Sequence, residues 1–157
     1  MIRPTTLADK CALIALAAET GLFESEQLLE LSAMLDQHLA VDAETHDLWF
    51  TDDDHGPVGV AYAAPERMTE GTWNLYLIAV HPNRQRQGRG TALLRRIETA
   101  LADRGQRVLL VETSGLEDFA HVRMFYRTCG FIEEARIREF YKAGDDKVIF
   151  RKGLKEN

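Results

Sequence analysis

The sequence contains little cysteine and no long apolar run, and each shortage excludes a class of protein. Its two cysteines, Cys11 and Cys129, are too few for a disulfide scaffold and lack the spacing of metal ligands. We therefore expect no metal site, and we expect both cysteines to be reduced, buried small hydrophobic residues. No apolar stretch approaches the ~18 residues that cross a bilayer, and the first residues lack the pattern of a secretion signal. These absences predict a cytoplasmic protein.

Basic residues are also fewer than acidic ones, which limits the kinds of molecule that the protein is expected to bind. The chain has 19 Lys and Arg against 25 Asp and Glu, a formal net charge of −6. Nucleic acids and anionic membranes select dominantly basic surfaces, so we expect neither as a partner. The deficit is not uniform. Residues 84–107 contain seven Arg and two acidic residues, a local charge of +5 that leaves −11 for the rest of the chain.

The remaining composition is that of a globular protein, with 45% hydrophobic and 28% charged residues. No repeat, low-complexity tract or Pro/Gly/Ser-rich linker divides the 157 residues. We therefore expect one domain over residues 1–157, long enough to bury its own core.

Hydrophobic periodicity predicts the elements of the first half. A short strand at residues 1–4 precedes a helix that begins at a capping-box sequence, residues 6–9, and ends at Gly21. The apolar residues that recur with helical period in this helix are Leu7, Cys11, Ile14, Ala15 and Ala18. A second helix from Ser25 carries an apolar face of Leu28, Leu31 and Leu35. A hairpin over residues 48–64 and a buried central strand over 73–80 follow.

The second half alternates helices and strands. A helix after Gly90 ends at Gly105, and the strand at 108–111 is followed by residues 112–115, which we expect to leave the core. The next helix ends at Gly130, and its apolar stripe is Phe119, Val122, Phe125, Tyr126 and Cys129. Strands at 131–141 and 147–152 close the chain. The order β-α-α-β-β-β-α-β-α-β-β predicts an α/β (α+β) fold with helices on the faces of a mixed sheet.

The most informative segment joins a buried strand to an amphipathic helix through Gln85-Arg86-Gln87-Gly88-Arg89-Gly90. Glycines at such a junction let successive backbone N–H groups converge, and the helix N-terminus adds partial positive charge. The loop therefore suits a pyrophosphate, and we expect Arg84, Arg86 and Arg89 to reinforce it. A P-loop would need Gly-Lys-Ser/Thr, and a dinucleotide fingerprint would need a third glycine; the sequence meets neither pattern.

Two motifs resemble those of the GCN5-related N-acetyltransferase (GNAT) family. Gln85, Gly88 and Gly90 after Val80 match the pattern Gln/Arg-x-x-Gly-x-Gly/Ala that follows a strand ending in Val. Residues 125–131, Phe-Tyr-Arg-Thr-Cys-Gly-Phe, are similar to the family segment Leu/Phe-Tyr-x-x-x-Gly-Phe. The resemblance implies a mostly antiparallel central sheet flanked by helices. It also implies an acetyl-CoA-dependent N-acetyltransferase that acts on a primary amine of a small molecule or peptide by direct attack in a ternary complex.

The same resemblance assigns residues to acetyl-CoA, the expected co-substrate. The Val80 N–H polarises the thioester carbonyl, and the loop amides bind the pyrophosphate. The family often has an Asn that holds the pantetheine arm or a water, and Phe119 stands at this position. Ser114, or else Thr113, is therefore expected to make that contact instead. The expected acetyl-CoA-binding residues are Val80, His81, Pro82, Gln85, Arg86, Gln87, Gly88, Arg89, Gly90, Thr91 and Ser114. Family members are often dimers, which makes a homodimer one assembly to test.

Acetyl transfer needs a neutral amine, a donor for the developing oxyanion and a proton for the leaving thiolate. Tyr126 stands at the position of the family's tyrosine and is the candidate general acid, because a phenol of pKa ~10 can protonate a departing thiolate of pKa ~8.5 when the two are hydrogen-bonded. Its alternative role is packing against Phe125. Strand 73–80 lacks the Glu that serves as base in several relatives, which leaves Glu112, at the end of a buried run, as the candidate base. A salt bridge or a helix cap explains Glu112 equally well, and water relay or binding of a neutral amine needs no dedicated base.

Acceptor binding is assigned to the segment between the first two helices, with Phe23 and Glu26, to Tyr76, to Glu112 and to the turn at 140–146. The carboxylates of these regions would attract a cationic amine, although helix capping and solvated loops explain the same residues. His81 and His121 are weaker candidates for a base, and we expect both at solvated positions.

Two other functions fit the same residues. One is a transferase for a different acyl-CoA, which would need a larger acyl pocket. The other is a non-catalytic acetyl-CoA-binding sensor or interaction module, which Phe119 and the missing strand Glu favour.

Overall fold

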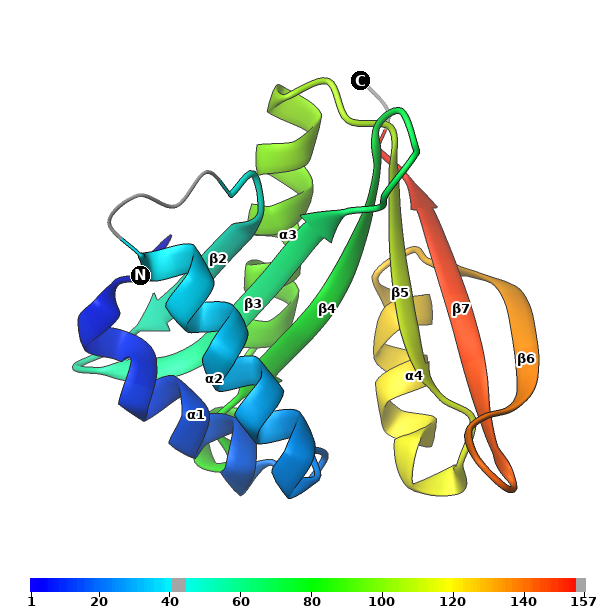
Figure 1. Cartoon of the computed structure of the whole chain (residues 1–157), viewed down its shortest axis with the longest axis horizontal. Helices are drawn as coiled ribbons and strands as arrows, with labels where there is room; N and C mark the ends of the chain where they lie inside the picture. Colours follow the sequence, from blue (N-terminus) through cyan, green and yellow to red (C-terminus); the bar gives the residue numbers. More distant parts are fainter. Residues whose placement is uncertain (41–44, 155–157) are drawn as a thin grey trace. The chain divides into compact units, whose positions relative to one another are not determined.

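The computed structural model describes residues 1–40 and 45–154, and its helices and strands follow the predicted order (Figure 1). The strands are β1 Ile2–Pro4, β2 Leu48–Asp53, β3 Pro57–Pro65, β4 Thr72–Val80, β5 Val108–Ser114, β6 Ile132–Lys142 and β7 Asp145–Gly153. The α-helices are α1 Lys10–Glu19, α2 Ser25–Leu39, α3 Arg89–Asp103 and α4 Ala120–Thr128. Short 3-10 helices are η1 Leu7–Asp9, η2 Pro82–Arg84 and η3 Glu117–Phe119.

The strands hydrogen-bond in the order β1-β2-β3-β4-β5-β7-β6. The β4–β5 pair is parallel, whereas the β1–β2, β2–β3, β5–β7 and β6–β7 pairs are antiparallel. The predicted mixed, mostly antiparallel sheet with flanking helices is therefore confirmed. No helix among residues 1–40 and 45–154 combines the length and apolar composition needed to cross a membrane.

The chain groups into two compact units, and each is described separately. The first unit comprises Met1–Ala64 and Leu77–Thr99, and the second comprises Pro65–Tyr76 and Ala100–Asn157. Strand β4 and helix α3 each contribute residues to both units.

In the first unit, α1 and α2 cover one face of β2 and β3, and α3 covers the other (Figure 1). On the first face, Trp49 stacks on Tyr62 with ring centroids 4.0 Å apart, within a cluster that includes Leu13, Leu16 and Leu35. On the other face, the Arg96 guanidinium lies 4.5 Å from the Phe50 ring centroid. A Cβ atom on Gly59 would lie 2.9 Å from the Leu93 side chain, so this glycine lets α3 approach β3 closely.

The buried face of α1 differs from the predicted one. Leu13, Leu16 and Ala17 are buried, whereas Leu7, Cys11, Ala15 and Ala18 are exposed and Ile14 is half-buried. Apolar residues occupy nearly the whole circumference of this helix, so periodicity could not distinguish the two faces. The prediction of a buried Cys11 is wrong for the same reason, and Cys129 is half-buried. The predicted face of α2 is confirmed, since Leu31 and Leu35 are buried and Leu28 packs against the same core.

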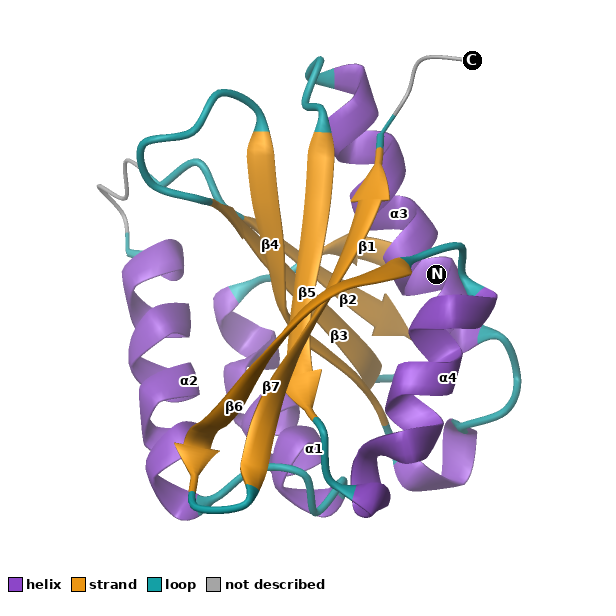
Figure 2. Cartoon of the chain, turned by 90° about the vertical axis from the view of Figure 1, so that its right-hand side faces the viewer, coloured by secondary structure: helices purple, strands orange, loops and turns teal. Residues whose placement is uncertain are grey.

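In the second unit, β7 lies between β5 and β6, and α4 packs against this layer (Figure 2). Tyr126 of α4 makes edge and tilted ring contacts with Phe131 and Phe150, at centroid distances of 5.7 and 5.9 Å. Strand β5 continues to Ser114, and Thr113 and Ser114 are buried, so the prediction that residues 112–115 leave the core is wrong for this stretch. The cause is β7, which pairs with β5 along its full length, from Val108 to Ser114.

One ion-pair network joins the start of the chain to the end of β2. Arg3 donates to both oxygens of Asp9, at 2.7 and 2.8 Å, and to Asp53 at 2.8 Å. The backbone N–H of Thr6 also donates to Asp9, which completes the predicted capping box. The hydrogen bond from Arg3 lowers the pKa of the buried Asp9 carboxyl to about 2.

This network predicts acid-sensitive stability. The folded pKa of Asp9 is depressed to about 2, so its contribution is fully present above the unfolded pKa of ~3.9 and is lost as the pH falls toward 2. Asp9→Asn is expected to lower the free energy of unfolding by roughly 2 kcal/mol at pH 7 and by much less near pH 2. Urea unfolding across this pH range measures the difference.

The matched control is Asp36→Asn, which removes a carboxylate that pairs with Lys10 at 2.6 Å but is 58% exposed. Exposed pairs contribute little, so this variant is expected to change stability by less than ~0.5 kcal/mol. Equal losses in the two variants would contradict the role assigned to Asp9.

Candidate functional site

The loop after β4, residues 81–91, is called the glycine loop below. Hydrogen bonds anchor its beginning: the His81 N–H donates to the Val58 carbonyl at 2.8 Å, and the Gln85 side-chain amide donates to the Val80 carbonyl at 3.1 Å. The Arg84 N–H donates to the His81 carbonyl at 2.8 Å, which closes the turn of η2. Gln85, the first residue of the predicted motif, therefore ties the loop back to the end of β4.

The end of the glycine loop presents free backbone donors. Ala92 makes the first bond of α3, donating its N–H to the Gly88 carbonyl at 3.0 Å. By helical geometry the N–H groups of Arg89, Gly90 and Thr91 have no acceptor within the helix. Gly88 has a φ of 77°, and a Cβ atom built on it would meet no atom within 4 Å. The loop thus offers a small anion-binding surface at the positive end of a helix dipole.

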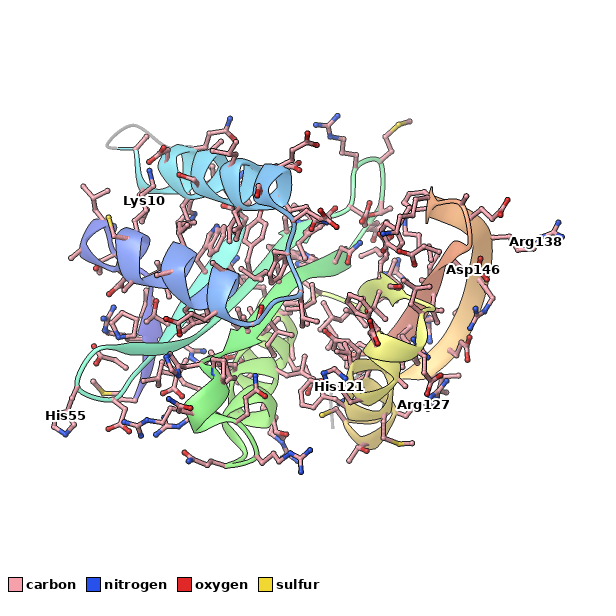
Figure 3. The ribbon with its side chains drawn as sticks, turned by 90° about the horizontal axis from the view of Figure 1, so that it is seen from below. Lys10, His55, His121, Arg127, Arg138 and Asp146 are labelled. Carbon is pink, nitrogen blue, oxygen red and sulfur yellow. The ribbon has the colours of Figure 1, made fainter. Side chains whose placement is uncertain are left out.

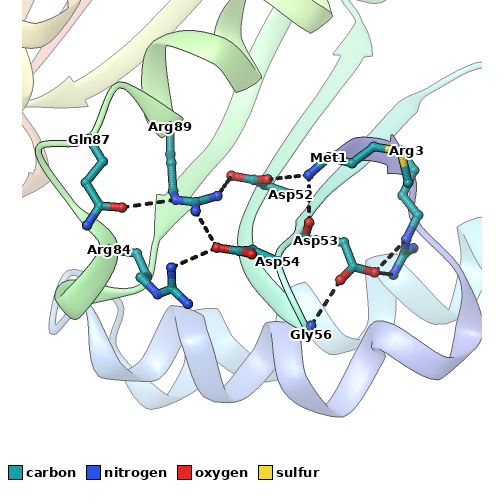
Figure 4. A network of polar contacts seen from close by, with 9 residues as sticks. All are labelled: Met1, Arg3, Asp52, Asp53, Asp54, Gly56, Arg84, Gln87 and Arg89. Atoms are coloured by element: carbon teal, nitrogen blue, oxygen red, sulfur yellow. Dashed lines mark hydrogen bonds and ion pairs between the residues drawn. The ribbon is translucent and has the colours of Figure 1, made fainter.

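The loop arginines do not all face this surface. The Arg84 guanidinium donates to Asp54 at 2.8 Å, and Arg89 donates to Asp52 and Asp54 at 2.9 and 2.6 Å (Figure 4). The expectation that Arg84 and Arg89 reinforce phosphate binding with their side chains is thus at odds with their contacts to the β2–β3 hairpin. Among the described residues, Arg86 makes no ion pair, and it has a φ of 59°.

The two candidate histidines differ in their surroundings. His81 Nδ1 accepts the Asn83 N–H at 3.2 Å, so Nε2 carries the proton and faces a Glu19 oxygen at 2.7 Å. His81 is therefore half-buried and pairs with Glu19, the last residue of α1. His121 is exposed on α4, as predicted (Figure 3).

The predicted acceptor residues of the first unit are not equally accessible. Phe23 is half-buried against the core beneath α1 and α2. Glu26 is exposed in the first turn of α2. Glu19, from the same segment, is held by His81.

In the second unit, Tyr126 is buried. Its ring contacts Phe125, Phe131 and Phe150 at centroid distances of 5.3–5.9 Å. Burial raises the pKa of the Tyr126 phenol well above its ordinary value. The phenol is thus neutral at any ordinary pH, as a proton donor must be.

Glu112 and Tyr76 belong to a cluster of carboxylates and aromatic rings in the second unit. The Lys147 ammonium lies 2.8 Å from Glu112 Oε2 and 3.9 Å from the Phe140 ring centroid. A salt bridge was one of the roles expected for Glu112, and the contact with Lys147 is such a salt bridge. The Tyr76 hydroxyl donates to Glu66 at 3.2 Å, and the residue is 51% exposed. Burial, followed by the negative charge of nearby carboxylates including Glu112, raises the pKa values of Tyr76 and Tyr141 to about 12.

Ser114 lies inside the second unit rather than on an open surface. Its hydroxyl donates to Asp145 Oδ1 and accepts the Leu116 N–H at 3.1 Å. The buried Arg123 guanidinium donates to the Ser114 and Leu116 carbonyls, both at 2.8 Å. Ser114 as an acetyl-CoA contact stays a prediction, and its hydroxyl already has two partners.

The structure adds residues that the sequence patterns did not indicate. Asp52 and Asp54 bind the loop arginines, Glu66 binds Tyr76, and Lys147 binds Glu112. The one available signal was the acidic turn at residues 52–54, whose charge complements the basic loop. The predicted site residues themselves divide between the two units: the glycine loop, Phe23 and Glu26 lie in the first, and Tyr76, Glu112, Ser114 and Tyr126 lie in the second.

Comparisons with known proteins bear on this geometry. A family model for the acetyltransferase (GNAT) domain matches residues 44–133. A crystal structure from Desulfovibrio desulfuricans, described as an acetyltransferase of the GNAT family, matches with a TM-score of 0.94 and 36% identity over 99% of both chains. A search of curated protein sequences finds no significant match.

More distant structures share the fold. An aminoglycoside 6'-N-acetyltransferase complexed with coenzyme A has a TM-score of 0.81 and 16% identity over 100% of this chain and 98% of that one. The ribosomal-protein-S18-alanine N-acetyltransferase from Escherichia coli has a TM-score of 0.78 and 21% identity over 100% and 95%. These findings confirm the resemblance carried by the two sequence motifs. Because the family model spans more than half of the chain and a GNAT structure matches nearly all of it, the chain belongs to the GNAT family of N-acetyltransferases.

Proposed function

We propose that this protein transfers an acetyl group from acetyl-CoA to a primary amine of a small molecule or peptide, by direct attack in a ternary complex. The observation that carries the proposal is the glycine loop, whose end presents the unbonded N–H groups of residues 89–91 beside the open face of Gly88. Two structures of the same fold were determined with coenzyme A or acetyl-CoA, which supports this choice of ligand.

The loop amides would bind the pyrophosphate of acetyl-CoA, and Arg86, which is exposed, is the loop arginine available to add charge. The Val80 N–H would polarise the thioester carbonyl and stabilise the oxyanion that develops on attack. The hydrogen bond from Gln85 to the Val80 carbonyl restrains this peptide region. In this proposal His81 and Pro82 shape the loop, because the ring nitrogens of His81 already have partners.

Tyr126 is the proposed general acid for the leaving thiolate. Its buried position keeps the phenol protonated, and its place in the Phe-Tyr-x-x-x-Gly-Phe segment is the second support. Burial disfavours the phenolate and the thiolate alike, so it leaves the difference between their pKa values about unchanged, and the proposed transfer needs a hydrogen bond between the two groups.

Glu112 is the proposed base. Lys147 contacts its Oε2, whereas no side chain within residues 1–40 and 45–154 donates a hydrogen bond to Oε1, so that oxygen would accept the proton from the amine. Relay through water is the alternative, and the ion pair with Lys147 explains the position of Glu112 without any catalytic role.

Acceptor binding is proposed for the cluster of carboxylates and aromatic rings in the second unit. Glu66 and Glu112 supply negative charge, and Tyr76, Phe140 and Tyr141 are 43–51% exposed. An ammonium group is attracted both by carboxylates and by the faces of aromatic rings. The proposed acceptor is therefore a cationic amine.

The first experiment is a thiol-release assay with acetyl-CoA over a panel of amines, amino acids, polyamines, aminoglycosides and peptides. Release that depends on an amine supports the proposed function. Binding of acetyl-CoA without release to any amine would favour a sensor or interaction module. Faster release from a longer acyl-CoA would favour another acyl donor.

Gly88→Leu is expected to raise the KM for acetyl-CoA more than tenfold, because the side chain would fill the space beside the amides. The matched control is Gly105→Leu, at an exposed turn with a φ of 70° and equally open surroundings. Both variants carry a backbone strain of ~1–2 kcal/mol, so both should lose similar thermal stability. An equal KM in the two variants would contradict the loop assignment.

Tyr126→Phe keeps the buried ring and removes the hydroxyl. It is expected to lower kcat about 100-fold, the usual contribution of a general acid, with little change in acetyl-CoA binding. Because the pKa of Tyr126 is raised, wild-type kcat should show no alkaline limb from this group below pH ~10. Tyr62→Phe, in the core of the first unit, is the control and should leave kcat unchanged.

Glu112→Gln and Lys147→Met together separate catalysis from ion pairing. Both remove the ion pair at 2.8 Å, but only the first removes the carboxylate. If Glu112 is the base, Glu112→Gln flattens the acidic limb of the kcat–pH profile, whereas Lys147→Met keeps a limb. The same profile in both variants would show that the pair is structural and would favour water relay.

A further inference from the structure

Two carboxylates of the β2–β3 hairpin hold two arginines of the glycine loop. Asp52 Oδ2 accepts from Arg89 at 2.9 Å, and Asp54 Oδ2 accepts from Arg89 at 2.6 Å and from Arg84 at 2.8 Å (Figure 4). Asp52 is the last residue but one of β2, and Asp54 follows the strand directly. The hairpin therefore contacts the loop at both ends of residues 84–89.

Three of the five N–H donors of the Arg89 guanidinium contact side chains of the protein. Nη1 binds Asp52, Nη2 binds Asp54, and Nε donates to the Gln87 side chain at 3.3 Å. A guanidinium has a rigid planar geometry, so three simultaneous contacts fix its orientation and, through it, the backbone to which it is attached. That backbone supplies one of the free N–H groups at the start of α3.

Burial strengthens this contact. Asp52 is 4% exposed and the Arg89 side chain is 20% exposed, so water screens their attraction only weakly. The amino group of Met1 lies 3.5 Å from the other Asp52 oxygen, which adds positive charge to the same carboxylate. Asp54 is more open, at 33% exposure. Burial opposes its ionisation, but the hydrogen bond and charge of Arg84 and the charge of Arg89 outweigh this effect, and the pKa of Asp54 lies below its ordinary value.

We propose that Asp52 and Asp54 are positioning residues for acetyl-CoA: through Arg89 and Arg84 they hold the backbone amides of the glycine loop in the arrangement that binds the pyrophosphate. The inference rests on the proposed function, because it concerns the same loop. It assigns binding to the amides and assigns a bracing role to Arg84 and Arg89.

For the replacement of Asp54, an electrostatic effect alone and a role in positioning the loop predict opposite changes in ligand binding. Replacing this carboxylate with an amide makes the surroundings of the loop more positive, which by electrostatics alone would tighten binding of an anionic ligand. If Asp54 positions the loop, the same replacement weakens binding, because Arg84 and Arg89 lose a shared partner. The direction of the change therefore separates the two explanations.

The test measures KM for acetyl-CoA, kcat, KM for the acceptor, and the Kd for CoA by calorimetry, in wild type, Asp54→Asn and Asp53→Asn. Asp53 lies on the same hairpin and its replacement changes the charge equally, but its side chain binds Arg3 and the Gly56 N–H instead of the loop. We expect Asp54→Asn to raise KM for acetyl-CoA and Kd for CoA about tenfold, a loss of ~1.4 kcal/mol of binding. We expect kcat and the acceptor KM to stay within twofold of wild type, and Asp53→Asn to leave all four values within twofold.

A second variant keeps the charge and removes the planar fork. Arg89→Lys is expected to raise KM for acetyl-CoA as Asp54→Asn does, because one ammonium cannot hold Asp52, Asp54 and Gln87 together. Thermal unfolding of each variant shows whether it folds. Arg89→Lys with wild-type affinity would overturn the inference.

The outcomes separate the inference from the proposed function. Unchanged or tighter binding of CoA by Asp54→Asn, or equal weakening in the Asp53→Asn control, would overturn the positioning role while wild type still binds and turns over. Failure of the wild-type protein to bind CoA or acetyl-CoA would overturn both.

Discussion

The glycine loop can present its amides to an anion only if its backbone is held in a conformation that an isolated chain would rarely adopt. Arg86 and Gly88 both have positive φ, 59° and 77°, and Arg86 lacks the freedom of glycine. None of the described strands pairs with this segment. The contact of Arg89 with Asp52 and Asp54 supplies the support from the neighbouring hairpin, and Gln85 ties the beginning of the loop to Val80. The arrangement of the free amides depends on these side-chain contacts.

These contacts show that part of the local positive charge is paired with carboxylates of the protein. Residues 84–107 carry seven Arg and two acidic residues, which indicates an anion-binding segment. In the structure, two of the arginines nearest the glycines face carboxylates of the hairpin. Binding of a pyrophosphate would then rely on backbone N–H groups and the helix dipole, which offer direction as well as charge. The carboxylates contribute by fixing geometry, and their negative charge is offset by the arginines that they hold.

The second unit uses charge in another way. Its carboxylates lie beside aromatic rings, and burial together with negative charge raises the pKa values of Tyr76 and Tyr141 to about 12. These phenols are therefore neutral hydrogen-bonding groups at any ordinary pH. Lys147 bridges Glu112 and the Phe140 ring, which orders the Glu112 carboxylate. A cluster of this kind suits a cationic acceptor better than an anionic one.

The sequence by itself determined the order of elements, the buried face of α2 and the family, and it predicted a phosphate-binding role for the glycine loop. These features depend on the periodicity of hydrophobic residues, on glycines at the ends of elements and on short motifs, and all three can be recognised from neighbouring residues in the sequence. Tertiary structure decided the rest. Helix α1 is apolar almost all round, so only packing against Trp49 and Tyr62 selected Leu13 and Leu16 over Cys11. Pairing with β7 kept Thr113 and Ser114 inside the second unit. The partners of Arg89 and Glu112 lie 37 and 35 residues away in the chain, and no local pattern specifies contacts across such separations.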